Sequence, residues 1–178
     1  MAYFSFTCKM IHSSLENPKN KIDRQRRLGR FIIFMRKLSI VTMGGFYFFV
    51  GWQHLVVPEF FLRICPPFLP FAEESVLLSG IWEMGVGLFL LIPKTRKIAG
   101  AAAVLLLIAV YPANLYMYFD PVPREFLGFS KMDALIRLFF QIPLVIIAIW
   151  HMKPQASTTF GVVCSALFFP TIIYFLTL

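Results

Sequence analysis

Five long apolar stretches constrain this chain more than any other feature of its sequence. They cover residues 38–57, 76–93, 98–119, 135–152 and 159–178. Each is close to the ~20 residues that an α-helix needs to cross a bilayer. A soluble domain of 178 residues could not bury this much apolar surface, because 58% of the residues are hydrophobic and only 15% are charged. The sequence therefore predicts an all-α membrane protein.

Basic residues predict how these stretches cross the membrane. Residues 1–37 carry nine Lys and Arg residues against two acidic ones, and so hold most of the formal net charge of +8. If the N-terminus is inside, residues 1–37, 94–97 and 153–158 place 13 basic residues there, and the outside loops 58–75 and 120–134 hold three. Basic residues favour the cytoplasmic side, so we expect a cytoplasmic N-terminus in a cell (inner) membrane. Because such a cluster is typical of a topology determinant that touches anionic lipid, we expect no nucleic-acid partner.

The apolar stretches divide the chain into three parts. We expect a basic cytoplasmic segment (residues 1–37), a four-helix transmembrane bundle (residues 38–152) and a fifth C-terminal span (residues 153–178). No cleavable signal peptide is expected, because the first apolar stretch is short and precedes the basic residues. For residues 1–34 a disordered tail, or a start of the protein downstream at Met35, is the alternative.

Two connections between the spans carry further information. Residues 94–97 alone join the second and third spans, and so short a connection requires an antiparallel hairpin. Gly80 and Gly87 on the second span, with several alanines on the third, predict close packing within this hairpin. The loop 58–75 is rich in Pro and Phe and cannot form a long helix. It either lies on the bilayer surface or covers an outward-facing cavity as a lid.

Polar side chains inside the spans gather at one depth. Ionisable groups are costly in a bilayer, so each one within a span is a candidate functional residue. Five polar side chains on four spans lie within ~10 Å of the outer end of their helix, at ~1.5 Å per residue. These candidate ligand-binding residues are His54, Glu83, Asn114, Arg137 and Gln141. Their shared depth predicts a polar site in the outer half of the bilayer.

We expect Glu83 and Arg137 to form an ion pair at this site. An isolated carboxylate would stay protonated or seek a cation, and Arg137 is the basic side chain within a span at that depth. Gln141, one turn from Arg137, and Asn114 or His54 would hydrogen-bond the pair. The alternative is that these groups only fix the register and rotation of the helices.

The sequence favours no cofactor. A metal site needs several converging ligands, and the polar cluster offers one histidine and one glutamate. His54 and His151 are expected near opposite faces of the membrane, which excludes a haem held by both. Cys8, Cys65 and Cys164 are widely separated, so neither a dithiol redox centre nor a disulfide is expected.

Several short motifs follow one another along residues 38–152. They are Gly51-Trp-Gln-His54, Leu78-Ser79-Gly80, Glu83 with Gly87, Val110-Tyr-Pro-Ala-Asn114, Arg137 and Gln141-Ile-Pro143. In order and spacing they resemble the DoxX-like family of small integral membrane proteins. The resemblance implies a four-helix membrane bundle and marks His54, Glu83, Asn114, Arg137 and Gln141 as motif positions. The family name derives from a subunit of a thiosulfate:quinone oxidoreductase, so quinone chemistry is implied by analogy.

Three functional hypotheses remain at this point. The first is an accessory or ligand-holding membrane subunit that binds a quinone or a lipid at the outer polar site, with a membrane protein as partner. The second is a component of a quinone-linked membrane oxidoreductase, in which His54 or Glu83 relays protons. The third is a purely structural membrane scaffold. Whether the chain is an enzyme stays open.

Overall fold

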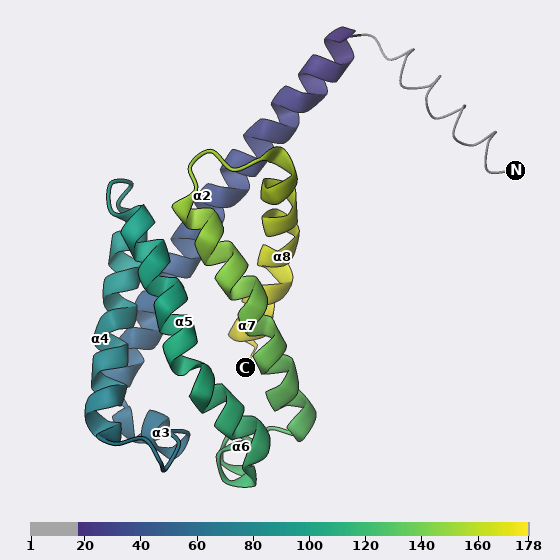
Figure 1. Ribbon diagram of the computed structural model, residues 1–178. Coiled ribbons are helices and arrows are strands. Elements are labelled where there is room, and N and C mark those ends of the chain that lie inside the picture. Colours follow the sequence, from purple (N-terminus) through teal and green to yellow (C-terminus); the bar gives the residue numbers. More distant parts are fainter. Residues whose placement is uncertain (1–17, 178) are drawn as a thin grey trace, which may run out of the picture.

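The computed structural model describes residues 18–177, which are mainly helical and contain no strand (Figure 1). The helices are α2 (Pro18–Val56), α3 (Pro58–Arg63), α4 (Ala72–Leu91), α5 (Arg96–Phe119), α6 (Pro121–Leu127), α7 (Lys131–Met152) and α8 (Thr158–Leu176). Five of them, α2, α4, α5, α7 and α8, are long and apolar enough to cross a membrane. The predicted all-α membrane architecture, with its fifth C-terminal span, is confirmed.

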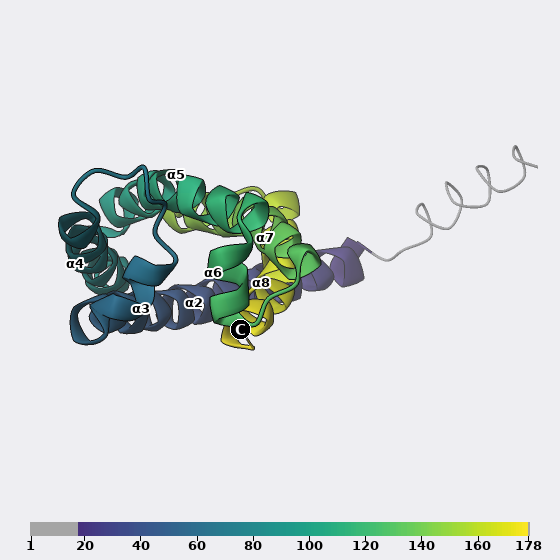
Figure 2. The ribbon, with the colours of Figure 1, turned by 90° about the horizontal axis from the view of Figure 1, so that it is seen from below.

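The five long helices form a ring, seen from one end in Figure 2. Around it, α2 packs on α4, α4 on α5, α5 on α7, α7 on α8, and α8 returns to α2. The short helices α3 and α6 lie at one end of the ring, here called the α3/α6 end. The α4–α5 connection lies at the opposite end, here called the hairpin end. In this order α4 and α7 are not neighbours, and that separation decides how the polar residues pair.

Glycines bring α2 and α4 to backbone contact. A Cβ atom on Gly51 would lie 2.5 Å from the carbonyl oxygen of Gly80, and one on Gly87 would lie 2.5 Å from that of Gly44. The two helices therefore meet at two reciprocal glycine contacts, one near each end of their interface. Small residues allow such close approach of membrane helices, where dispersion forces and weak hydrogen bonds act over the whole interface.

The prediction that Gly80 and Gly87 pack against the next helix of the hairpin is wrong. Gly80 and Gly87 pack on α2 and not on the next helix of the hairpin, although α4 and α5 do lie side by side. The close contact of α5 is made instead with α7, where a Cβ on Gly100 would lie 3.0 Å from the carbonyl oxygen of Ala148. A short connection fixes that two helices are antiparallel neighbours, but it does not fix the rotation of each helix about its axis.

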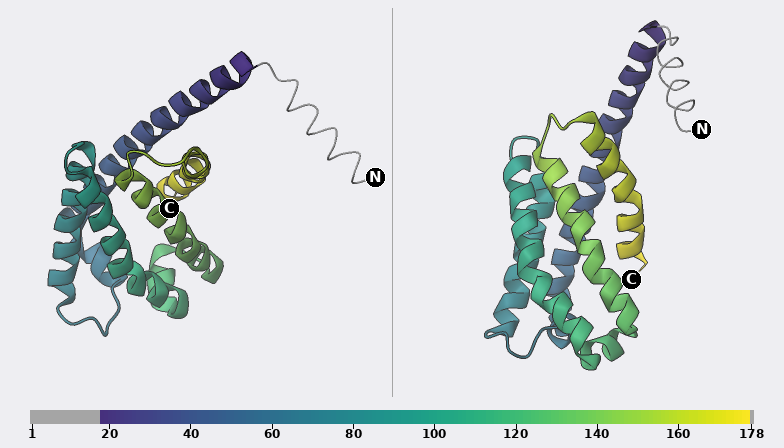
Figure 3. Two further views of the ribbon diagram at one scale, coloured as in Figure 1. Left: turned by 45° about the horizontal axis from the view of Figure 1, so that its top comes forward. Right: turned by 45° about the vertical axis from the view of Figure 1, so that its right-hand side comes forward.

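Helix α2 extends well past the rest of the ring at the hairpin end (Figure 3). Its 39 residues span ~58 Å at ~1.5 Å per residue, about twice the ~30 Å of a bilayer core. Residues 18–34 are helical, so the alternative of a disordered tail is wrong for this part. Residues 1–17, and with them the question of a signal peptide, lie outside the described residues.

The loop 58–75 begins with α3, a helix of only six residues, as its proline content predicts. Phe60 of α3 contacts Phe126 of α6 with 5.5 Å between ring centroids, and the Arg63 guanidinium lies 4.9 Å from the same ring. The two short helices thus meet over the α3/α6 end of the ring (Figure 2). This contact places the aromatic part of the loop against the bundle.

Candidate functional site

The five predicted site residues form two groups on different helix pairs. His54 and Glu83 lie between α2 and α4, whereas Asn114, Arg137 and Gln141 lie between α5 and α7. The predicted ion pair is therefore wrong: in residues 18–177 the carboxylate of Glu83 faces His54, and Arg137 donates to Asn114. Equal depth along the membrane normal does not bring two side chains together when their helices, α4 and α7, are not adjacent.

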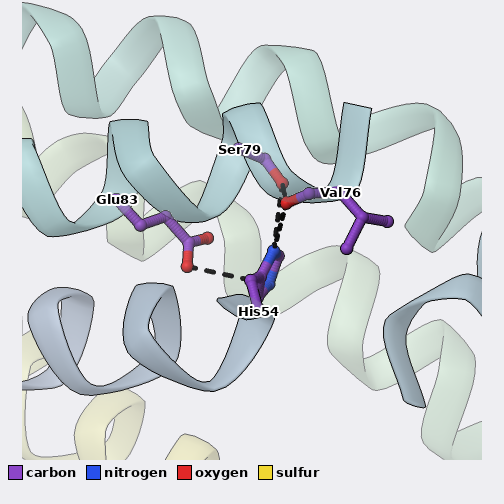
Figure 4. A network of polar contacts seen from close by, with 4 residues as sticks. All are labelled: His54, Val76, Ser79 and Glu83. Atoms are coloured by element: carbon purple, nitrogen blue, oxygen red, sulfur yellow. Dashed lines mark hydrogen bonds and ion pairs between the residues drawn. The ribbon is translucent and has the colours of Figure 1, made fainter. Parts of the chain in front are cut away.

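His54 and Glu83 form the centre of the first group (Figure 4). The Nε2 atom of His54 lies 3.8 Å from Oε2 of Glu83. On the other side of the ring, Nδ1 lies 3.1 Å from the carbonyl oxygen of Val76 and 3.0 Å from Oγ of Ser79. The hydroxyl of Ser79 donates to that same carbonyl at 2.9 Å. The contacts of Nδ1 with Val76 and Ser79 hold the imidazole ring in one orientation.

The contact with Val76 determines which nitrogen of His54 carries a proton. A carbonyl oxygen can only accept, so Nδ1 is the donor in this hydrogen bond. In the neutral tautomer Nε2 then presents a lone pair to the Glu83 carboxyl group. A lone pair and a carboxylate oxygen repel each other, so the pair is stable when one proton lies on either Nε2 or Glu83. The arrangement can hold, accept or release that proton.

Two glycines make this approach of His54 and Glu83 sterically feasible. A Cβ on Gly80 would lie 2.5 Å from the Cβ of His54, and a Cβ on Gly51 would lie 2.9 Å from the Cβ of Glu83. At either position a larger residue would push the two functional side chains out of place. The glycine contacts between α2 and α4 thus build the site as well as the fold.

The first group contains buried polar atoms that bond to no other protein group. His54 is 8% exposed, Glu83 9% and Tyr47, two turns before His54 on α2, 6%. Neither Oε2 of Glu83 nor the hydroxyl of Tyr47 has a hydrogen-bond partner in residues 18–177, and the two groups lie within electrostatic range of each other. Each such atom disfavours the fold by about 1–3 kcal/mol. A polar group that bonds to both would remove this penalty.

Phe61 of α3 covers the first group from the α3/α6 end. Its ring lies 3.6 Å from that of His54, centroid to centroid, at an interplanar angle of 40°. The imidazole is therefore enclosed by α2, α4 and α3. Sequence reasoning identified His54 and Glu83 but missed Tyr47 and Phe61. The spacing of Tyr47 and His54, seven residues and close to two helical turns, is the signal that could have indicated Tyr47.

The second group is a chain of hydrogen bonds from α7 to α5. Arg137 Nε donates to Asn114 Oδ1 at 2.9 Å, and Asn114 Nδ2 donates to Gln141 Oε1 at 3.3 Å. Gln141 Nε2 in turn donates to the backbone carbonyl of Leu107 at 2.6 Å. Of the predicted hydrogen-bond partners of Arg137, Asn114 bonds it directly, whereas Gln141 bonds Asn114 and makes no hydrogen bond to Arg137. Each amide has one donor and one acceptor engaged, so the chain fixes the orientation of the guanidinium.

A third polar group, at the hairpin end, was not predicted. Arg36 donates from Nε to the carbonyl oxygen of Trp150 at 3.2 Å and from Nη2 to that of His151 at 2.7 Å. Ser39 Oγ lies 2.9 Å from Nε2 of His151, and both side chains are buried. Arg36 therefore caps the carboxyl end of α7. Two features of the sequence could have indicated this contact. Arg36 and Ser39 have the i, i+3 spacing of one helix face, and His151 stands at the end of an apolar stretch.

The donor set at these groups favours hydrogen bonding and proton exchange. In residues 18–177 no three His, Cys, Asp or Glu side chains come together. His54 and Glu83 can each carry or release a proton, Tyr47 can donate one hydrogen bond, and Arg137 supplies a permanent positive charge.

Comparison with known proteins identifies a family for the membrane core. No curated protein and no solved structure matches the chain. Residues 43–152 match a family described as Domain of unknown function (DUF8561). This range contains Tyr47 and all five predicted site residues, and it ends before α8 begins. Since it covers more than half of the sequence, the chain belongs to the DUF8561 family.

Proposed function

We propose that this membrane protein is an accessory subunit that holds a small ligand with an apolar body and a hydrogen-bonding headgroup, a quinone or a lipid. The observation that carries the proposal is the buried Oε2 of Glu83, which has no hydrogen-bond partner in residues 18–177, lies 3.8 Å from His54 and is within electrostatic range of Tyr47. A ligand hydroxyl would donate to Glu83, and a ligand carbonyl would accept from Tyr47. A few convergent polar groups in apolar surroundings are typical of the residues that orient a small molecule.

The resemblance to DoxX-like proteins supports a quinone as the ligand. A quinone headgroup has two carbonyl oxygens that become hydroxyls on reduction, and the His54–Glu83 pair offers a donor for the first state and an acceptor for the second. This property favours a second candidate function, a component of a quinone-linked oxidoreductase. In that case the pair would relay protons and a partner protein would supply the redox centre.

Replacing Glu83 tests ligand binding directly. We expect native mass spectrometry of the protein in mild detergent, with solvent extraction, to find one quinone or lipid per chain. Glu83→Gln should lower its occupancy about tenfold or more, because a hydrogen bond to a charged group contributes about 1.5–3 kcal/mol. Glu74→Gln is the matched control, the same substitution at an exposed position of the same helix, and should keep the ligand. If all three proteins carry the same molecules, or none, the polar groups are structural and the scaffold hypothesis replaces this one.

We also infer that the N-terminus is cytoplasmic, in a cell membrane, which Cys65 can test. This half-buried thiol lies in the connection between α3 and α4, and its burial raises its pKa above the usual 9.0. In a Cys8→Ser background, a membrane-impermeant maleimide added outside should label Cys65 slowly at pH 7 and faster as the pH rises, because only the thiolate reacts. Cys164, buried in α8, should react only after denaturation. Labelling of Cys65 that requires permeabilised membranes would mean the opposite orientation.

A further inference from the structure

Arg137 is a cation within a spanning helix that has no carboxylate partner. It lies ~9 Å from the start of α7, at ~1.5 Å per residue, and is partly buried. In residues 18–177 its guanidinium makes no ion pair; it donates to Asn114 and lies 5.7 Å from the ring of Phe175. Arginine stays protonated in proteins, so this charge cannot be removed by loss of a proton.

The nearby acidic side chains are engaged elsewhere. Asp133, one turn before Arg137 on α7, accepts from the backbone nitrogen of Ser130 at 2.8 Å and from its hydroxyl at 2.7 Å. Glu83 faces His54 on the other helix pair. An uncompensated charge at membrane depth is costly, which is why such residues pair with an opposite charge or reach water. The described residues therefore supply no counter-ion for Arg137.

The guanidinium is oriented to receive such a counter-ion. Its Nε donates to the side-chain oxygen of Asn114. The side-chain amide of Asn114 donates to Gln141, and that of Gln141 donates to the backbone carbonyl of Leu107. Its two terminal amino groups donate to no protein atom in residues 18–177. A fixed fork of parallel N–H groups matches two oxygens of a phosphate or carboxylate, which is the geometry that distinguishes arginine from lysine.

Helix α8 supplies an aromatic wall beside this fork. Phe175 lies under the guanidinium, and Tyr174 stacks on Phe140 of α7 with 4.2 Å between ring centroids. Tyr174 also lies within electrostatic range of Arg137. Both residues belong to α8, which follows the residues matched by the family. A low-dielectric wall strengthens the attraction between the guanidinium and an anion.

We propose that Arg137, oriented by Asn114 and Gln141 and walled by Tyr174 and Phe175, binds a phosphate group at the α3/α6 end of the bundle. This phosphate belongs either to the headgroup of a membrane phospholipid or to a small free phosphate. The site is independent of the ligand proposed at Glu83, since it lies on another helix pair and binds through a different chemistry. An experiment can therefore contradict either proposal without contradicting the other.

Binding of dioctanoyl phosphatidic acid to the full chain tests the proposal. In an uncharged detergent, native mass spectrometry should detect one bound molecule per wild-type chain. R137Q should bind it at least tenfold more weakly, and K131Q, the loss of an exposed cation on the same helix, should change binding by less than twofold. R137K keeps the charge but lacks the fork and should bind several-fold more weakly. E83Q should bind like wild type.

Two further measurements complete the test. Inorganic phosphate that displaces the lipid through an Arg137-dependent site would identify a small phosphate as a sufficient ligand, whereas lipid binding without such displacement would identify the phospholipid. If R137Q does not fold, R137K and N114A, which removes the acceptor that orients Nε, replace it, and both should weaken binding several-fold. Equal binding by wild type and these variants, or no binding of either probe to wild type, would overturn the proposal.

Discussion

Gly51→Ala should lower the free energy of unfolding by about 2–3 kcal/mol, the upper part of the range for inserting a methyl group into a close-packed contact. The added Cβ would lie 2.5 Å from the carbonyl oxygen of Gly80 and 2.7 Å from the backbone nitrogen of Met84. Backbone atoms cannot rotate away as the end of a flexible side chain can. Helices α2 and α4 must therefore move apart along their interface, and His54 must move away from Glu83.

Gly45→Ala is the matched control for this substitution. Gly45 lies on the same helix, but no atom lies within 4 Å of the Cβ position. Replacing it should stabilise the protein slightly, because alanine is favoured over glycine in a helix by about 1 kcal/mol. In detergent, thermal unfolding followed by tryptophan fluorescence should show a midpoint lower by about 5–10 °C for Gly51→Ala. Equal midpoints for the two variants would mean that the glycine contact does not hold α2 against α4.

Arg36→Met should lower the free energy of unfolding by about 2 kcal/mol, the second largest effect that we expect. Arg36 donates two hydrogen bonds to the last carbonyl groups of α7, at 3.2 and 2.7 Å. Hydrogen bonds from a charged donor contribute about 1.5–3 kcal/mol each when buried, and the partial exposure of this side chain reduces that value. Methionine keeps most of the apolar packing of the arginine stem, so the loss reports the hydrogen bonds and the charge at the helix end.

Arg30→Met separates this effect from a general loss of positive charge. Arg30 lies on the same helix and is exposed, so its replacement should change stability by less than about 0.5 kcal/mol. Arg36→Lys should fall between the two, because a single ammonium group cannot replace the two-pronged contact with Trp150 and His151. The same unfolding measurement in detergent compares all three variants. A midpoint for Arg36→Met that matches Arg30→Met would show that the end of α7 needs no such cap.

The candidate site was only partly accessible from the sequence. Depth along each span selected His54, Glu83, Asn114, Arg137 and Gln141, and the structure joins His54 to Glu83 and Arg137, Asn114 and Gln141 to one another. Depth could not indicate their partners, because a partner depends on which helices are neighbours and on how each is rotated. Tyr47 was missed because a tyrosine in a span is most often part of the apolar packing, and its relation to Glu83 exists only once α2 and α4 are paired.

The sequence by itself determined the number of long apolar helices and the residues at which they end. Each predicted stretch ends within two residues of the end of the corresponding helix. The first stretch, 38–57, compares with an end of α2 at Val56, and the last, 159–178, compares with an end of α8 at Leu176. Transfer of a residue into the bilayer depends mainly on that residue and its immediate neighbours, so a local reading of hydropathy is sufficient. The starts are less well placed, above all that of α2, which begins 20 residues before the apolar stretch at residue 38.

Only the tertiary structure decided which faces of the helices meet. The ring order, the pairing of Gly51 with Gly80 and the contact of Arg36 with α7 all depend on residues far apart in the chain. Inside a bilayer every face of a helix can be apolar, so hydropathy does not indicate which face is buried. Rotation is set by shape, by close backbone contacts and by a few hydrogen bonds summed over several helices at once. For that reason the polar residues were predictable, and the separation of Glu83 from Arg137 was not.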